Sequence, residues 1–318
     1  MSADLELLME MHRYKRPAGG PTEQEYRQRF LVPLGVQEDK FGNLILDIGE
    51  NPTVLWSSHT DSVHRGEGKQ RIVFDGKYIA LHKKSKASCL GADDAAGNFI
   101  MMKMIEAKVP GRYIFHAQEE IGRIGSENIA KNTPELLKGI QAAVAFDRKG
   151  TDSVITHQMG ERGASDEFAR SLAAQLPDGF KPDANGSFTD TKSYHRLVPE
   201  CTNVAVGYYD AHTSAERLDV DHLFRLRDAM IKIDAAQLVI ERDPSKVEEK
   251  QFSFGGFGGL SRLGRGPRDF FDLCFSYPED VATVLESMPL DFEQFKNLVL
   301  FERDQRRAER FPTLRKAS

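Results

Sequence analysis

The sequence predicts a three-layer α/β fold, in which helices cover both faces of a mixed, mainly parallel sheet. Strand-like apolar runs alternate with helical segments between residues 40 and 240, which is typical of such a sheet. Turn signals between residues 43 and 80 indicate some antiparallel strands at one side. Beyond residue 241 the apolar periodicity gives way to a charged and then glycine-rich stretch, so we expect only a small C-terminal helical extension there.

The chain is predicted to begin with helices and to continue with strands. Residues 1–40 have helical apolar spacing, and Thr22 is of a residue type that often starts a helix. Strands are predicted over 43–48 and 53–57. The Asp75-Gly76 pair further on is typical of a tight hairpin turn.

Helices and strands are predicted to alternate from there to residue 240. A serine at position 165 has the residue type of a good helix N-cap. The predicted helices span residues 97–108, 126–137, 165–176 and 219–240, and the predicted strands span 112–116, 141–146 and 203–208.

The predicted domains are unequal in size. A length of 318 residues allows two domains of roughly 150 residues each. The patterns instead favour one α/β domain over 1–245, a glycine-rich linker over 246–268 and a small helical tail of unknown role over 269–318.

Composition excludes several classes of protein. The balance of 43 Lys+Arg against 48 Asp+Glu is too acidic for a dedicated nucleic-acid binder. Cys89, Cys201 and Cys274 are odd in number and far apart, which indicates neither a disulfide framework nor a thiolate zinc site. No apolar run approaches the roughly 18 residues of a membrane helix, and the N-terminus lacks the pattern of a signal peptide. We therefore expect a cytoplasmic protein with neither nucleic-acid nor membrane partners.

Acidic and histidine residues follow the ends of the predicted strands. In parallel α/β sheets, ligands bind just beyond the carboxyl ends of the strands, so these side chains are expected to meet at one edge. A further cluster lies in the loop that starts a helix. The residues are His59 with Asp61, Asp93 with Asp94, Glu119 with Glu120, Asp147, and His212.

Two histidines and at least three carboxylates suit a pair of divalent metal ions, which many hydrolases use. Each cluster also has an ordinary interpretation on its own. His59 and Asp61 fit a surface loop, Glu119-Glu120 a solvated turn, and the Asp93-Asp94 pair a helix N-cap. Their common placement at strand ends favours a metal site.

The motifs, taken in order, resemble those of the co-catalytic dinuclear zinc exopeptidases, the metallopeptidase groups M20, M28 and M42. The resemblance covers about residues 20–240. The matching motifs are Ser58-His59-Thr60-Asp61, Leu90-Gly91-Ala92-Asp93-Asp94-Ala95-Ala96-Gly97, Gln118-Glu119-Glu120-Ile121-Gly122, Phe146-Asp147, and His212 with Glu216.

The resemblance implies a role for each of these residues. His59, Glu120, Asp147 and His212 would be metal ligands. Asp93 would bridge two Zn²⁺ ions, with Asp94 as the alternative bridge and with Co²⁺ or Mn²⁺ as alternative metals. Glu119 would be the general base, and Asp61 would hydrogen-bond the imidazole of His59. Glu216 would orient the region around His212.

The resemblance also implies a fold and an activity. The fold would be phosphorylase/hydrolase-like, and residues 148–211 are too few to include the lid domain of many relatives, so the compact lid-free form is expected. The 1–245 domain would be an aminopeptidase that acts on peptides or small amides, and oligomers are possible in this group. Two alternatives are open: an amidohydrolase or dipeptidase for an acylated amino acid or dipeptide-like metabolite, and a non-catalytic metal-binding scaffold.

Three other segments have two interpretations each. Arg148-Lys149 is a candidate for holding a substrate carboxylate or a charge at the rim of the site. Thr189-Asp190-Thr191 is a candidate for shaping the pocket or binding a free amine, or is a helix cap. Cys89 precedes the Asp93 loop and is expected to be a small buried residue rather than part of the site.

Overall fold

The computed structural model describes residues 2–246 and Leu285. Residues Met1–Phe252 form one compact unit and Ser253–Ser318 a second. The predicted linker (246–268) and tail (269–318) lie outside the described residues, except for Lys246 and Leu285. Among the residues that the structure describes, no helix is both long and apolar enough to cross a membrane.

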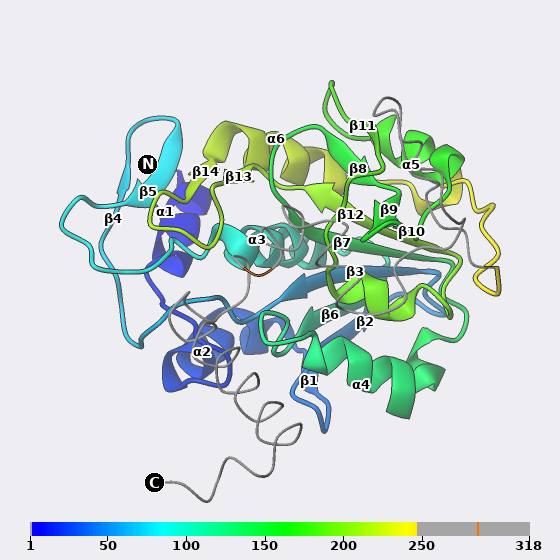
Figure 1. Cartoon of the computed structure of the whole chain (residues 1–318), viewed down its shortest axis with the longest axis horizontal. Helices are drawn as coiled ribbons and strands as arrows, with labels where there is room; N and C mark the ends of the chain where they lie inside the picture. Colours follow the sequence, from blue (N-terminus) through cyan, green and yellow to red (C-terminus); the bar gives the residue numbers. More distant parts are fainter. Residues whose placement is uncertain (1, 247–284, 286–318) are drawn as a thin grey trace, which may run out of the picture. The chain divides into compact units, whose positions relative to one another are not determined.

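A mixed, mostly parallel sheet of eight strands forms the centre of the first unit, as predicted (Figure 1). In spatial order the strands are β1 (Gln37–Glu38), β2 (Leu44–Ile48), β6 (Gly111–His116), β3 (Val54–His59), β7 (Ala142–Arg148), β12 (Glu200–Ala205), β8 (Ser153–Ile155) and β11 (Lys181–Asp183). The four strands β6, β3, β7 and β12 are parallel to one another. In contrast, β2 is antiparallel to β6, and β8 is antiparallel to β12.

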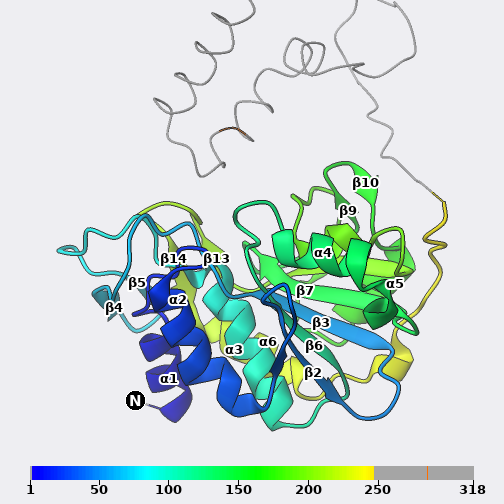
Figure 2. The same ribbon diagram turned by 90° about the horizontal axis from the view of Figure 1, so that it is seen from below.

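Helices cover both faces of this sheet (Figure 2). Side chains alternate between the two faces of a strand, so Trp56 of β3 packs in the core that includes helix α3, whereas Leu55 packs in a second core with residues of helix α4. The burial of both faces explains why β3 is apolar or small along most of its length. The helices are α1 (Ala3–Met11), α2 (Pro21–Tyr26), α3 (Ala92–Glu106), α4 (Ile124–Asn132), α5 (Asp166–Ala173) and α6 (Val220–Met230).

A smaller antiparallel sheet contains the predicted hairpin. Asp75 accepts hydrogen bonds from the N–H groups of Lys77 and Tyr78, and Gly76 has a φ of 103°, which glycine adopts without strain. This sheet has the order β13 (Tyr208–Tyr209), β14 (Arg217–Asp219), β5 (Tyr78–Leu81) and β4 (Ile72–Phe74), and a separate hairpin joins β9 (His157–Gln158) to β10 (Glu161–Arg162).

Several predicted helices have different ends in the structure. The predicted helix 126–137 ends at Asn132, because Pro134 lacks the N–H that would continue it, and a 3-10 turn, Pro134–Leu137, follows. The predicted helix 219–240 stops at Met230, and the side chain of Asp234 then caps a separate 3-10 turn, Ala235–Gln237. Short 3-10 and π segments also span Arg27–Leu31, Val32–Leu34 and Asp190–Tyr194.

Candidate metal centre

The five predicted ligands meet beyond the carboxyl ends of the central strands. His59 is the last residue of β3, Asp147 lies near the end of β7, and Glu120 follows β6. Asp93 is at the start of α3, and His212 is in the loop between β13 and β14. The parallel pairing of β3 with both β6 and β7 places three of these side chains at or beyond the same ends of neighbouring strands.

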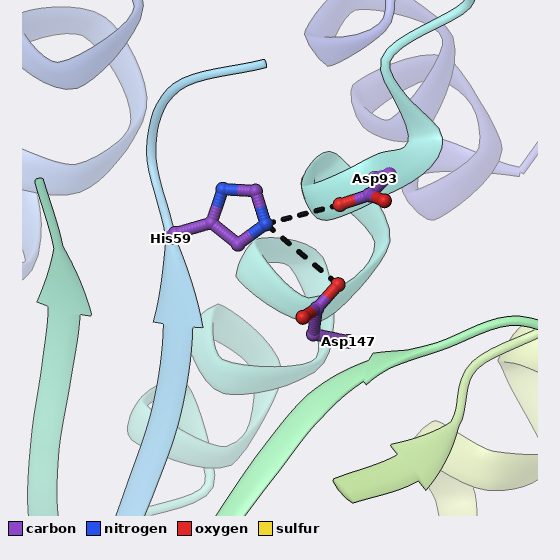
Figure 3. Close-up of side chains that lie close together, drawn as sticks. All are labelled: His59, Asp93 and Asp147. Carbon is purple, nitrogen blue, oxygen red and sulfur yellow. Dashed lines mark hydrogen bonds and ion pairs between the residues drawn. The ribbon is translucent and has the colours of Figure 1, made fainter. Parts of the chain in front are cut away.

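His59, Asp93 and Asp147 form a first group of potential ligand atoms. The Nε2 atom of His59 lies 3.0 Å from Oδ1 of Asp93 and 3.7 Å from Oδ1 of Asp147. Figure 3 shows the three side chains converging from β3, from the start of α3 and from β7. All three ligand atoms lie within 4.8 Å of one another, a spacing that one metal ion could span.

Asp93, Glu120 and His212 form a second group. The Nε2 atom of His212 lies 3.2 Å from Oδ2 of Asp93 and 3.3 Å from Oε2 of Glu120. The two oxygens of Asp93 thus face different groups, as a bridging carboxylate requires. The carboxylate of Asp94 instead accepts from the N–H groups of His59 and Gly97, at 3.2 Å and 2.9 Å.

Backbone conformation separates the roles of these two aspartates. Asp93 has a ψ of 101° and Asp94 a ψ of 45°, so regular helical geometry in α3 begins only after them. Asp93 is thereby aimed at the two histidines. Asp94 accepts from the N–H of His59, and Asn98 donates to the carbonyl of His59 at 2.9 Å. These two contacts attach the end of β3 to α3.

The donor set fits divalent cations. The side chains of His59, Asp93, Asp147 and Glu120 are at most 11% exposed, and in the described part of the chain no Lys or Arg pairs with these carboxylates. Oε1 of Glu120 is buried and has no hydrogen-bond partner among the described residues. Buried carboxylates are costly without a neutralising charge, which metal ions would supply. His212 is 31% exposed, so the second group is the more open of the two.

The histidines balance this negative charge in the metal-free protein. Burial lowers the pKa of His212, but the charges of Glu120 and Asp93 outweigh it and raise the pKa to about 12. Burial likewise opposes the charged form of His59, whereas the neighbouring carboxylates of Asp147, Asp61 and Asp93 favour it. The pKa of His59 lies well above its usual value. The surrounding carboxylates therefore favour the positively charged form of both imidazoles.

Asp61 supports the site through backbone groups. Its Oδ1 accepts from the N–H of Glu119 at 3.0 Å, and its Oδ2 accepts from the N–H of Glu120 at 3.1 Å. Its Oδ1 also lies 3.5 Å from Nδ1 of His59, an ion-pair separation longer than a normal hydrogen bond. The predicted contact with His59 is thus the weaker of its interactions.

The carboxyl group of Glu119 favours its protonated form more than an exposed glutamate does. Burial is the main cause, and the charges of Asp190, Asp147 and Glu120 act in the same direction against the influence of His59. Together they raise the pKa of Glu119 well above its usual value. A carboxylate with a raised pKa is a stronger base, which suits proton transfer near neutral pH.

Two supporting residues of Asp147 are not apparent from sequence patterns. The hydroxyl of Tyr208 donates to Oδ1 of Asp147 at 3.0 Å. The side chain of Asn203 accepts from the N–H of Asp147 and donates to its carbonyl, at 2.9 Å and 2.8 Å. Asn203 lies in β12, which pairs with β7, so the sheet register creates this contact.

Glu216 supports a different segment from the one predicted. We expected it to orient the region around His212, but its carboxylate accepts from the N–H groups of Leu90, Gly91 and Asp93 at 2.8 to 3.1 Å. The reason is tertiary: Glu216 immediately precedes β14, whose pairing with β5 brings it close to the loop before α3.

The other candidate segments lie around the centre. Arg148 contacts Asp183 at 3.6 Å and the carbonyl of Asn185 at 2.8 Å. Asp190 is 1% exposed, and its Oδ2 lies 3.3 Å from Nδ1 of His116. Cys89 is buried, and burial raises the pKa of its thiol.

Neither a protein-family model nor a curated protein matches the sequence. Solved structures share the fold. Aminopeptidase PepT from Bacillus cereus superposes with a TM-score of 0.58 at 16% identity, covering 74% of this chain and 97% of that one. A tripeptidase from Staphylococcus aureus gives 0.57 at 16%, with 74% and 98% covered. The TET1 peptidase of Pyrococcus horikoshii gives 0.54 at 16%, with 72% and 98% covered.

Proposed function

We propose that this chain is a dinuclear zinc exopeptidase, most specifically an aminopeptidase. The observation that carries the proposal is the pair of three-residue ligand groups that share Asp93. Glu119 immediately precedes the ligand Glu120 in the chain. The fold supports it, because structures with this fold include proteins described as aminopeptidases and a tripeptidase.

Each ligand group would hold one metal ion. His59, Asp93 and Asp147 would bind the first ion, and Asp93, Glu120 and His212 the second. Nitrogen and oxygen donors suit Zn²⁺, with Co²⁺ or Mn²⁺ as alternatives. When bound, such ions supply Lewis-acid chemistry, which polarises a peptide carbonyl and makes a water molecule more acidic.

The protein side chains would position the water and transfer its proton. Glu119 takes a proton from the attacking water on a carboxylate oxygen and delivers it to the nitrogen of the leaving amine. Asp61 holds the peptide groups of Glu119 and Glu120, so that the base and a ligand keep a constant separation. Tyr208 and Asn203 hold Asp147.

Replacing the proposed base separates metal binding from catalysis. We expect Glu119→Ala to retain about two zinc ions per chain and to lose hydrolysis of aminoacyl and short peptide substrates, since a general base contributes about 10²–10⁴-fold. Metal analysis and an aminopeptidase assay measure the two properties. Glu127→Gln is the matched control, because Glu127 contacts Lys131, Ser193 and Arg123 in and around α4 and touches no proposed ligand. Full activity of Glu119→Ala would rule out this mechanism.

A substrate panel separates the aminopeptidase from the alternative amidohydrolase. Peptides with a free α-amine are expected to be hydrolysed faster than N-acylated amino acids. The reverse order would favour the amidohydrolase or dipeptidase for acylated or dipeptide-like metabolites. Metal binding without hydrolysis of either class would favour the non-catalytic scaffold.

A further inference from the structure

Arg16 is a fully buried arginine whose guanidinium contacts two of the three segments that carry the first ligand group, the end of β3 and the loop before α3. It lies between α1 and α2. Its Nε donates to the carbonyl of Thr60 at 3.0 Å, and its Nη2 donates to the carbonyl of Gly91 at 2.8 Å. Thr60 stands between His59 and Asp61, and Gly91 is two residues before Asp93.

The backbone of Arg16 is bound to the same strand-end loop. Its carbonyl accepts from the N–H of Ser62 at 2.8 Å, and its N–H donates to Nδ1 of His64 at 3.2 Å. The aromatic ring of Tyr26 lies 4.7 Å from the guanidinium carbon. Arg16 therefore has little freedom to move relative to residues 60–64.

Two buried side chains, Arg16 and Glu216, bind the backbone of Gly91 in the loop before α3. The carbonyl of Gly91 accepts from Arg16, and its N–H donates to Glu216 at 2.9 Å. Gly91 has a φ of 74°, and a Cβ there would lie 2.7 Å from the ring of His64, so the backbone path is closely defined.

The chemistry of arginine explains why this residue suits the position. Among the described residues, no carboxylate forms an ion pair with Arg16, so backbone carbonyls and an aromatic ring are its main partners. A buried charge without an ionic partner lowers the stability of the folded protein, so stability by itself does not explain an arginine here. A planar guanidinium can donate in several directions at once, whereas an ammonium group is a compact charge.

We propose that Arg16 is a positioning residue for the metal centre, which sets the loop that carries Asp93 relative to the strand end that carries His59. This inference rests on the proposed function only in requiring that the centre binds metal. Residues that support ligands typically change metal affinity about 10–100-fold when they are replaced.

Two Arg16 variants and one control test the proposal. Arg16→Lys keeps the charge but loses the fork, and Arg16→Met removes the charge at similar length. Arg242→Met is the matched control, because Arg242 is also buried and donates to the carbonyls of Val198 and Pro199. Those carbonyls precede β12, and β12 runs parallel to β7, so they lie at the end of the strands opposite to the ligands.

Calorimetric titration of the metal-free full-length proteins with Zn²⁺ gives the affinities, and thermal unfolding without metal gives the stabilities. We expect both Arg16 variants to bind Zn²⁺ at least about 10-fold more weakly than wild type, and Arg242→Met to bind like wild type despite lower stability. If Arg16→Met does not fold, Arg16→Lys decides the question.

Three results would overturn the inference. Wild-type affinity in the folded Arg16 variants would remove the positioning role and leave the proposed function intact. An equal loss of affinity in Arg242→Met would show a general effect of destabilisation. A wild-type chain that binds no Zn²⁺ would end both this inference and the proposed function.

Discussion

Asp61 accepts hydrogen bonds from two consecutive peptide groups, and this contact defines the turn that carries both Glu119 and Glu120. A carboxylate can accept from both N–H groups, whereas an asparagine side chain has only one oxygen and would turn its NH₂ toward the other. The orientation of Glu119 relative to Glu120 thus depends on Asp61. The main contacts of Asp61 are with backbone N–H groups, and it is not one of the proposed metal ligands.

We predict that Asp61→Asn lowers kcat/KM about 10–100-fold while zinc content changes little. The expected cause is a displaced Glu119, which misaligns proton transfer. Steady-state kinetics and metal analysis measure the two quantities, and circular dichroism checks the fold. Activity within about twofold of wild type would show that the turn holds its shape without Asp61.

Helix α6 illustrates how local signals act at the scale of an element. Asp219 is its N-cap, and Oδ1 accepts from the N–H of His222 at 3.0 Å. The start of this helix was predicted at residue 219 and is confirmed, because capping depends on neighbours in sequence. Its end was not predicted well, because the end depends on the packing of residues after Met230.

Replacing Asp219 tests the contribution of the cap. Asp219→Ala is expected to lower the free energy of unfolding by about 1 kcal/mol, and Asp219→Asn by clearly less, because asparagine caps as well as aspartate does. Chemical denaturation of both variants measures the difference. If alanine and asparagine destabilise equally, the ion pair of Asp219 with Lys77 matters more than the cap.

Buried histidines link the stability of the whole molecule to pH. Burial lowers the pKa of five buried histidines outside the ligand groups: His12, His64, His116, His195 and His222. For His12 the pKa falls from 6.5 to about 4. The unfolded chain then binds a proton that the folded chain does not, so this contribution to stability is complete above pH 6.5 and is lost progressively toward pH 4.

The comparison of His12→Phe with wild type isolates this effect. As the pH falls from 7 to 4, the free energy of unfolding of wild type should decrease by about 3 kcal/mol more than that of the variant. Denaturation of the metal-free proteins across this range provides the measurement. A constant difference between the two proteins at every pH would contradict a buried neutral His12.

The fold and most of the candidate centre could be predicted from the sequence for a physical reason. Alternating apolar segments imply a covered sheet. Polar residues that follow strand ends imply a common edge, and His59, Glu120 and Asp147 do lie at or beyond the carboxyl ends of β3, β6 and β7. Their roles as metal ligands stay a prediction. Zinc, a cytoplasmic location and an oligomeric state stay predictions, although the TET1 peptidase of similar fold is described as assembling into a tetrahedron or a large octahedral shell.

Sequence by itself determined which residue types meet at the sheet edge, because the order of strands and the positions of polar residues along the chain are properties of the chain. Only the tertiary structure decided that Asp93 rather than Asp94 faces both histidines, that Glu216 holds the loop before α3, and that Arg16 joins that loop to the end of β3. These contacts depend on backbone angles and on segments up to 126 residues apart, which sequence spacing does not constrain.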